Sequence, residues 1–191
     1  RNMRSALDQH EFHDQAWVDH LLQRFADHYF VALDAYDQDP ATAPVVWQLA
    51  HTASHTSNVL PLQKMLVGVN AHINYDLVLT LVEVLDPEWD SLSTDQRAVR
   101  YADHCHVNTV IGRTIDAVQD QVLDPVMPIM AILDKVLGRV DETLISHLIT
   151  HWRETVWHNV TRLLEMKDPI ERAQLMSEIE RAALRLGNAL V

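Results

Sequence analysis

Residues that punctuate or cross-link a chain are scarce in this sequence. Its 191 residues include one cysteine, four glycines and seven prolines. A single cysteine excludes an intrachain disulfide and fits a reducing compartment, so we expect the cytoplasm. So few turn residues argue against an all-β protein, which needs a tight turn about every 8–12 residues. The chain is therefore expected to be helical.

Basic residues and long apolar runs are also few. Lys and Arg number 15 against 27 Asp and Glu, which gives a net charge of −12. No basic run is present to contact nucleic acid, and an anionic membrane surface would repel such a chain. No apolar run approaches the roughly 18 residues of a transmembrane helix, and we see no signal peptide. We expect a small-molecule or lipid substrate, without nucleic acid or a membrane span.

Apolar periodicity and capping residues divide the chain into about seven helices. Pro40 and Pro87 follow aspartates that end two of them, and Ser93 with Gln96 forms a capping box that begins another. The expected helices span residues 11–37, 44–57, 62–85, 93–123, 125–138, 141–166 and 169–186. This length suits one hydrophobic core. We predict an all-α, single-domain bundle over residues 1–191.

The helix over residues 62–85 is expected to be central and buried, because both of its sides are largely apolar. His72 and Asp76 share one stripe of this helix with Leu79 and Glu83. A buried polar group needs a partner. His72 and Asp76, four residues apart, are expected to bind one divalent metal ion together. A hydrogen bond between them, or with a neighbouring helix, is equally open.

The next helix repeats this pattern with His104 and Asn108, which lie four residues apart on a core-facing stripe. We expect the two polar pairs to meet in a shared interior site. His104 is expected to be a further metal ligand or a general base. Asn108 and Asn74 are expected to orient the reacting groups.

Histidine is over-represented, with 12 residues, and it is the commonest metal ligand. Two further sets have helical spacing that suits a metal, but each lies opposite an apolar face, which favours a solvated stripe. The sequence leaves open whether they face solvent or a site. These sets are His51 with His55, and His147, His151 and Glu154 with His158.

One ten-residue run reads Gly68-Val69-Asn70-Ala71-His72-Ile73-Asn74-Tyr75-Asp76-Leu77. It resembles the hallmark of a bacterial and fungal family of all-α proteins of unknown function, Gly-Met-Asn-Ala-His-Ile-Asn-x-Asp-Leu, with Val69 in place of Met. Further similarity lies at residues 103–108 and 138–142 and at Arg153 with Trp157, within residues 45–165. The resemblance implies an all-helical fold and brings no reaction with it. It singles out His72, Asn74, Asp76, Asn108 and Arg153.

These residues lead to the hypothesis of a hydrolase-like, metal-dependent enzyme that acts on a phosphate-bearing small molecule or lipid. A divalent ion (Zn, Mg or Fe) would let an acidic protein accept a phosphate group. The fork of Arg153 suits a carboxylate or phosphate. The expected metal ligands are His72, Asp76 and His104, and the expected catalytic residues are His104, Asn108, Arg153 and Asn74.

Two alternatives remain open. The first is a metal-assisted lyase or cyclase of an isoprenoid diphosphate, which predicts a deep pocket lined by Trp47, Tyr75 and Trp157. The second is a helical binding or assembly module without enzymatic activity, whose buried polar groups only fix the packing. It predicts neither a metal nor a cavity at His72. Gly-rich phosphate loops, His-Glu-x-x-His and Gly-x-Ser-x-Gly are absent, so no familiar motif decides between them.

Overall fold

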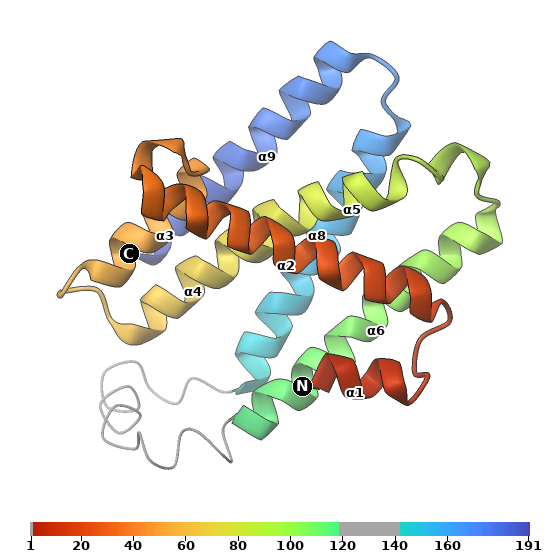
Figure 1. Cartoon of the computed structure of the whole chain (residues 1–191), viewed down its shortest axis with the longest axis horizontal. Coiled ribbons are helices and arrows are strands. Elements are labelled where there is room, and N and C mark those ends of the chain that lie inside the picture. The colour runs from red at the N-terminus through yellow and green to blue at the C-terminus, as the bar shows by residue number, and fades with distance from the viewer. Residues whose placement is uncertain (1, 119–141) are drawn as a thin grey trace. The chain divides into compact units, whose positions relative to one another are not determined.

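The computed structural model describes residues 2–118 and 142–191, and every regular element within these ranges is a helix (Figure 1). The predicted all-α class is confirmed. With Pro61–Leu85 counted as one continuous helix, the described residues contain seven helices. The short helix expected at residues 125–138 lies outside the described residues.

The helices begin and end within a few residues of the positions expected from caps and prolines. The last one extends to Leu190 rather than residue 186, and the first, α1, was not predicted. A π-helical segment, η2 (His72–Asp76), joins α4 to α5, and short 3-10 turns cover Pro40–Thr42 and Trp89–Ser91. The α-helices are α1 (Asn2–Asp8), α2 (Gln15–Gln38), α3 (Val45–His55), α4 (Pro61–Ala71), α5 (Leu77–Leu85), α6 (Thr94–Val118), α8 (Glu142–Glu165) and α9 (Pro169–Leu190).

Helix α1 ends in a left-handed residue that is not glycine. The backbone of His10 has a φ of 55°. The Glu11 N–H donates to the Ala6 carbonyl at 3.1 Å, and the His10 N–H donates to the Leu7 carbonyl at 3.0 Å. These two hydrogen bonds form a Schellman cap, whose left-handed position is usually glycine. A seven-residue helix closed by histidine gives neither a clear period nor a stop signal, which explains why it was missed.

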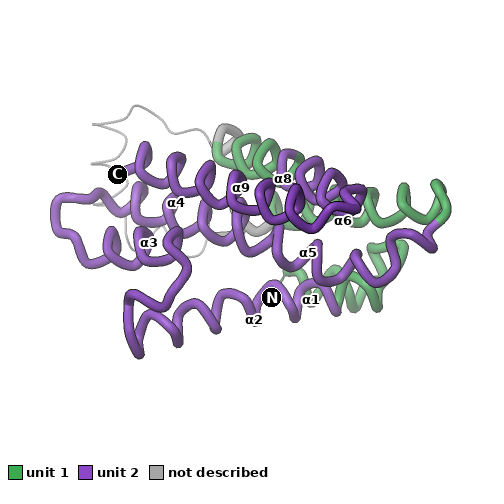
Figure 2. The backbone as a smooth tube through the Cα atoms, turned by 90° about the horizontal axis from the view of Figure 1, so that it is seen from above, with its two compact units in different colours: residues 1–19, 93–154 green, residues 20–92, 155–191 purple. Residues whose placement is uncertain are grey.

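The described chain clusters into two compact units, each built from two separate stretches (Figure 2). Unit 1 contains residues 1–19 and 93–154, and unit 2 contains residues 20–92 and 155–191. The expected single domain over residues 1–191 stays a prediction.

In unit 2, helices α3, α4 and α9 pack against one another. Their shared core contains several alanines, and small side chains let helix backbones approach closely. Trp47 is the one large ring among the buried members of this cluster, and it is 4% exposed. The buried members are Ala32, Val46, Trp47, Ala50, Val67, Ala71 and Ala183.

The π-helical segment changes which residues share a face. At its end the Leu77 N–H donates to the His72 carbonyl, five residues back rather than four. One extra residue in a turn rotates all later side chains by about 100° relative to an uninterrupted α-helix. Glu83, expected on the stripe of Asp76, is accordingly exposed and bonded to Arg24, whereas Asp76 is buried.

Residues 61–85 are the one helix in the described ranges that is long and apolar enough to cross a membrane by length and composition. Half of its most apolar window is buried inside the protein, and a buried core helix has the same composition. Buried residues recur along this helix from Val67 to Leu85, whereas Glu83 is exposed and Met65 near the start is 46% exposed.

In unit 1, the segment before α2 is held on α6 by hydrogen bonds. Asp103, 1% exposed, accepts the backbone N–H groups of His13 (2.7 Å) and Asp14 (2.8 Å). Glu11 accepts from His106 at 3.0 Å and from Arg113 at 2.8 Å. Asp103 thus fixes the start of α2 through backbone groups that no side-chain pattern reveals.

Gly187 on α9 should be much less tolerant of alanine than Gly68 on α4. A Cβ at Gly187 would lie 2.8 Å from Leu49 Cδ2 and 3.2 Å from Asn70 Nδ2, and hydrogen bonding holds that amide in place. At Gly68 a Cβ would meet no described atom within 4 Å. We expect Gly68→Ala to raise the free energy of unfolding by about 0.5–1 kcal/mol and Gly187→Ala to lower it by about 1–2 kcal/mol. Equilibrium urea unfolding measures both, and equal stabilisation would contradict this packing.

Candidate functional site

The polar residues of the central helix meet in unit 2 around a buried carboxylate. Asp76 is 1% exposed. Its two oxygens accept the Trp47 Nε1–H at 3.0 and 3.1 Å, and one of them also accepts from His72 Nδ1 at 2.9 Å. A buried carboxylate without such donors would be strongly destabilising. Trp47 and His72 therefore both hold Asp76, and Asp76 in turn fixes the orientation of the His72 ring.

His72 lies against an aromatic wall on α2. Its ring stacks on Phe25 with centroids 3.7 Å apart and an interplanar angle of 12°, and Tyr29 meets it edge-on at 5.8 Å. About a third of the His72 side-chain surface, 30%, is exposed to solvent. Its Nε2 makes no hydrogen bond with any described residue. The arrangement leaves one oriented and accessible imidazole nitrogen.

The sequence left open whether His72 and Asp76 bind a metal ion together or form a hydrogen bond with each other, and this geometry favours the hydrogen bond. His72 and Asp76 bond to each other, and Asp76 lies behind His72 with both oxygens occupied. Among the described residues no three His, Cys, Asp or Glu side chains come close enough to hold a metal ion together. A metal shared by His72 and Asp76 stays a prediction, and it would require Asp76 to give up a donor.

Asn74 and Asn70 form a second polar pair on this helix. Asn74 Nδ2 donates to Asn70 Oδ1 at 3.0 Å, and Asn70 Nδ2 donates to the Ala183 carbonyl of α9 at 2.9 Å. Asn70 is 2% exposed. This chain ties α9 to α4, so the contacts of Asn74 indicate packing, while its expected catalytic role stays a prediction.

Unit 1 holds the other expected site residues, on α6 and α8. Arg153 is 3% exposed, and its Nε donates to Asn108 Oδ1 at 2.6 Å. Its Nη2 donates to the His104 carbonyl at 2.8 Å and approaches His104 Nδ1 at 3.4 Å. Asn108 and Arg153, both singled out from the sequence, are thus direct partners. Because these residues belong to unit 1 and His72 to unit 2, a site shared by both sets stays a prediction.

His104 is held by both of its ring nitrogens. Nε2 lies 3.1 Å from the Arg153 carbonyl, which can only accept, so the proton is on Nε2 and Nδ1 faces Arg153 Nη2. Burial lowers the pKa of His104 well below its ordinary value of 6.5, and the Arg153 charge lowers it further. A neutral imidazole with both nitrogens engaged is a packing group. The expected role as metal ligand or base stays a prediction, and it would require breaking one of these contacts.

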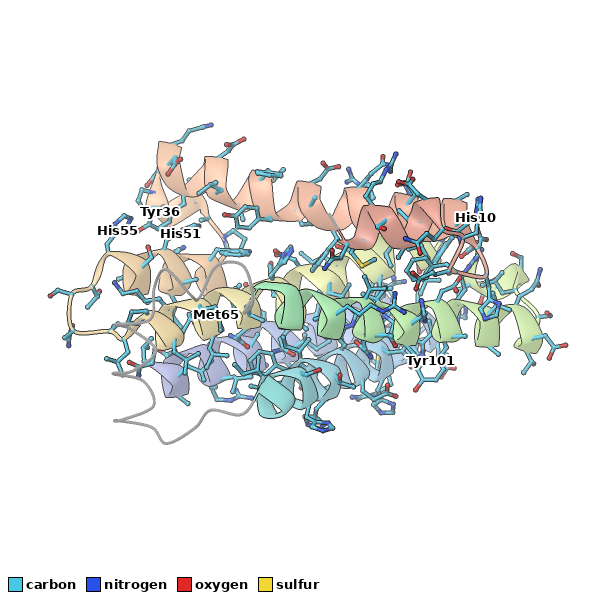
Figure 3. The ribbon with its side chains drawn as sticks, turned by 90° about the horizontal axis from the view of Figure 1, so that it is seen from below. His10, Tyr36, His51, His55, Met65 and Tyr101 are labelled. Carbon is cyan, nitrogen blue, oxygen red and sulfur yellow. The ribbon has the colours of Figure 1, made fainter. Side chains whose placement is uncertain are left out.

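The remaining histidine sets separate clearly. His147, His151, Glu154 and His158 are all exposed, as the solvated-stripe interpretation expects. On α3, the ring of His51 contacts the rings of Tyr36 (centroids 4.5 Å apart) and Trp47 (5.5 Å), and its buried Nε2 has no hydrogen-bond partner among the described residues. Figure 3 shows Tyr36 beside His51, with His55 further along α3. Burial lowers the pKa of His51, which favours its neutral ring, and whether His51 and His55 serve a site stays open.

Sequence reasoning missed two residues that the structure places at the centre of these clusters. Trp47 was considered only as part of an apolar pocket, yet its indole N–H is a main donor to Asp76. Phe25 was given no role, yet it stacks on His72. The contact of Trp47 with Asp76 joins residues 29 positions apart, and that of Phe25 with His72 joins residues 47 positions apart. No local sequence pattern predicts contacts between helices at such separations.

The chain belongs to a family of unknown function (DUF5995), whose family model matches residues 1–191. The expected resemblance to an all-helical family of unknown function is thereby confirmed at that level. Comparisons with curated proteins and with solved structures found no match. No reaction is assigned to this family, so any function has to come from the polar residues around Asp76 in unit 2 and around Arg153 in unit 1.

His72 and His104 should carry their proton on opposite nitrogens. Asp76 accepts from Nδ1 of His72, and the Arg153 carbonyl accepts from Nε2 of His104. We expect the neutral ring of His72 to be the Nδ1–H tautomer and that of His104 the Nε2–H tautomer. Long-range ¹H–¹⁵N NMR of the imidazoles reads this directly. An Nε2–H form of His72 would contradict the proposed hydrogen bond to Asp76.

His104 should make stability depend on pH below neutrality. Below about pH 6.5 the unfolded chain protonates this histidine while the folded chain does not, so the free energy of unfolding falls as the pH falls. The contribution approaches about 1.4 kcal/mol per pH unit. Urea unfolding between about pH 7 and 5 should give a shallower slope for His104→Gln than for wild type. Equal slopes would mean that His104 protonates alike in both states.

Proposed function

We propose that the protein is an enzyme in which Nε2 of His72 either transfers a proton or binds a metal ion. Asp76 is the carboxylate that orients the His72 ring. The observation that carries this is the hydrogen bond from His72 Nδ1 to buried Asp76, combined with an Nε2 that has no partner among the described residues. A carboxylate behind a histidine fixes its tautomer and stabilises the imidazolium that forms when Nε2 takes a proton. This is the geometry of a general acid–base group.

The surroundings of the pair support this role. Trp47 holds both oxygens of Asp76, so the carboxylate cannot rotate away from His72. Phe25 stacks on one face of the imidazole and limits water there. The pair also lies in a π-helical segment, and such segments are frequent at functional sites.

A packing role alone explains the other buried polar groups better than it explains His72. Asn70, Asn74 and His104 have partners within the described protein. His72 has a partner on one nitrogen only, and the other keeps access to solvent. The binding-module alternative predicts that Nε2 of His72 neither transfers a proton nor binds a metal. Chemical modification of His72 and the activity of His72 variants test this.

The metal-dependent form of this proposal uses the same nitrogen. Metal-bound histidines usually donate their other N–H to a carboxylate, as Nδ1 does here. An imidazole nitrogen suits Zn or Fe better than Mg, which prefers oxygen. His72 would then be the ligand and Asp76 its support. The substrate we propose, a phosphate-bearing small molecule or lipid, is the one expected from the sequence.

We further propose that the run from Gly68 to Leu77 is a signature of the family. Its four polar side chains other than Tyr75 are Asn70, His72, Asn74 and Asp76. All four take part in the hydrogen bonds described above. The run would thus encode both the α4–α9 packing and the reactive histidine.

Diethyl pyrocarbonate tests the reactive nitrogen without requiring a substrate. An accessible neutral Nε2 should be carbethoxylated, so mass spectrometry of peptides should show modification at His72 and protection at buried His104. Asp76→Asn should slow the reaction at His72, because the neutral amide no longer supports charge on the ring. His158→Gln, an exposed histidine of the same unit, is the matched control and should leave the His72 rate unchanged. A His72 as protected as His104 would end the proposal.

Activity on chromogenic phosphate mono- and diesters should then follow the same residues. We expect His72→Gln to lower turnover by about 10²–10⁴-fold, with His158→Gln near wild type.

Thermal melts with and without chelator distinguish the metal-dependent form of the proposal from the metal-free form. A melting temperature that falls on chelation in wild type but not in His72→Gln supports the metal form, by linkage of about 2.7 kcal/mol at a hundredfold excess over the dissociation constant. Identical melts favour metal-free acid–base chemistry.

A further inference from the structure

The charge of Arg153 has no counter-ion among the described residues of unit 1. Its hydrogen-bond partners are the Asn108 amide oxygen, the His104 carbonyl and the neutral His104 ring, none of which is charged. Two described acids of this unit direct their carboxylates at other groups. Glu154 accepts the Tyr101 hydroxyl at 2.7 Å, and Asp103 accepts two backbone N–H groups.

The thiol of Cys105, which interacts electrostatically with Arg153, does not supply the charge either. Burial raises the pKa of Cys105, so it stays a neutral thiol. Arg153 itself remains a cation, because burial lowers its pKa only to about 10. A cation that is 3% exposed and has only neutral partners carries a desolvation cost, and no described residue of the unit offsets it with an opposite charge.

The donors of Arg153 point to where the missing charge would sit. A guanidinium has five N–H donors. Nε uses one for Asn108, and Nη2 directs its two at the His104 carbonyl and ring. The two donors of Nη1 make no hydrogen bond with a described residue. Asn108 and His104 hold the fork rigid from one side and leave its other end free.

We propose that Arg153 is the anchor of an oxyanion-binding site in unit 1, which takes the carboxylate or phosphate group of a small molecule on Nη1. Asn108 and His104 are its positioning residues, since they fix the plane of the guanidinium. The inference does not rest on the role proposed for His72, and binding tests it without any activity.

Thermal melts in different anions test the site. Inorganic phosphate and acetate, each against chloride at equal ionic strength, are the two probes. Either should raise the melting temperature, by about 5–10 °C at a hundredfold excess over its dissociation constant. A larger shift with phosphate identifies a phosphate site, and a shift with acetate alone identifies a carboxylate site. Neither anion exceeding chloride overturns the proposal.

Asn108→Asp is the decisive variant. It keeps the shape of the side chain, and its carboxylate accepts from Arg153 Nε in place of the amide oxygen, so the counter-ion is built into the protein. We expect it to melt higher than wild type in chloride and to lose most of the anion-dependent shift. Arg153→Gln should lose that shift as well, while Arg113→Gln, a surface arginine of the same unit that pairs with Glu11, should keep it. An undiminished shift in Asn108→Asp would place the anion elsewhere and refute the site.

Discussion

The need to satisfy a buried carboxylate organises the candidate site. Asp76 lies almost entirely out of water, where an ionised group without donors is strongly disfavoured. The indole of Trp47 and the imidazole of His72 meet this need together, and each is thereby fixed. The same requirement links three elements, because Trp47 comes from α3, Asp76 from η2 and the ring stacked on His72 from α2. Removing Asp76 would therefore release more than one contact.

Sequence patterns predicted the helices well because their signals are local. Asp168 before Pro169 and the capping box at Ser93 lie within one turn of the helix starts they mark, and the structure has both caps. The choice of His72 and Asp76 as a pair was also local, since four residues separate them. The failure came with the π-helical segment, because a helical wheel assumes an uninterrupted α-helix and one inserted residue turns every later side chain.

The roles of the pairs depended on partners that spacing does not reveal. Asn74 was expected to orient reacting groups, but its amide donates to Asn70, whose own amide donates to the Ala183 carbonyl, 113 residues away. The spacing of His104 and Asn108 on one helix likewise does not reveal that the backbone carbonyl of Arg153, 49 residues away, lies 3.1 Å from His104 Nε2. Backbone carbonyls have no sequence identity, so no pattern of residue types predicts which side chain they will engage. The residues that keep unused donors or lone pairs can be recognised only after such contacts are known.

Unit 2 closes with the last helix of the chain. The Asn70 amide donates to the Ala183 carbonyl, 113 residues later, and the Gln63 side chain donates to the Leu190 carbonyl, 127 residues later. Contacts this distant in sequence require a long loop to close and generally slow folding. During synthesis, α3 and α4 are complete about a hundred residues before α9 begins, and their alanine-lined surfaces must meanwhile avoid aggregation. Until α9 has been synthesised, the surface of α3 and α4 that it covers stays exposed to other chains.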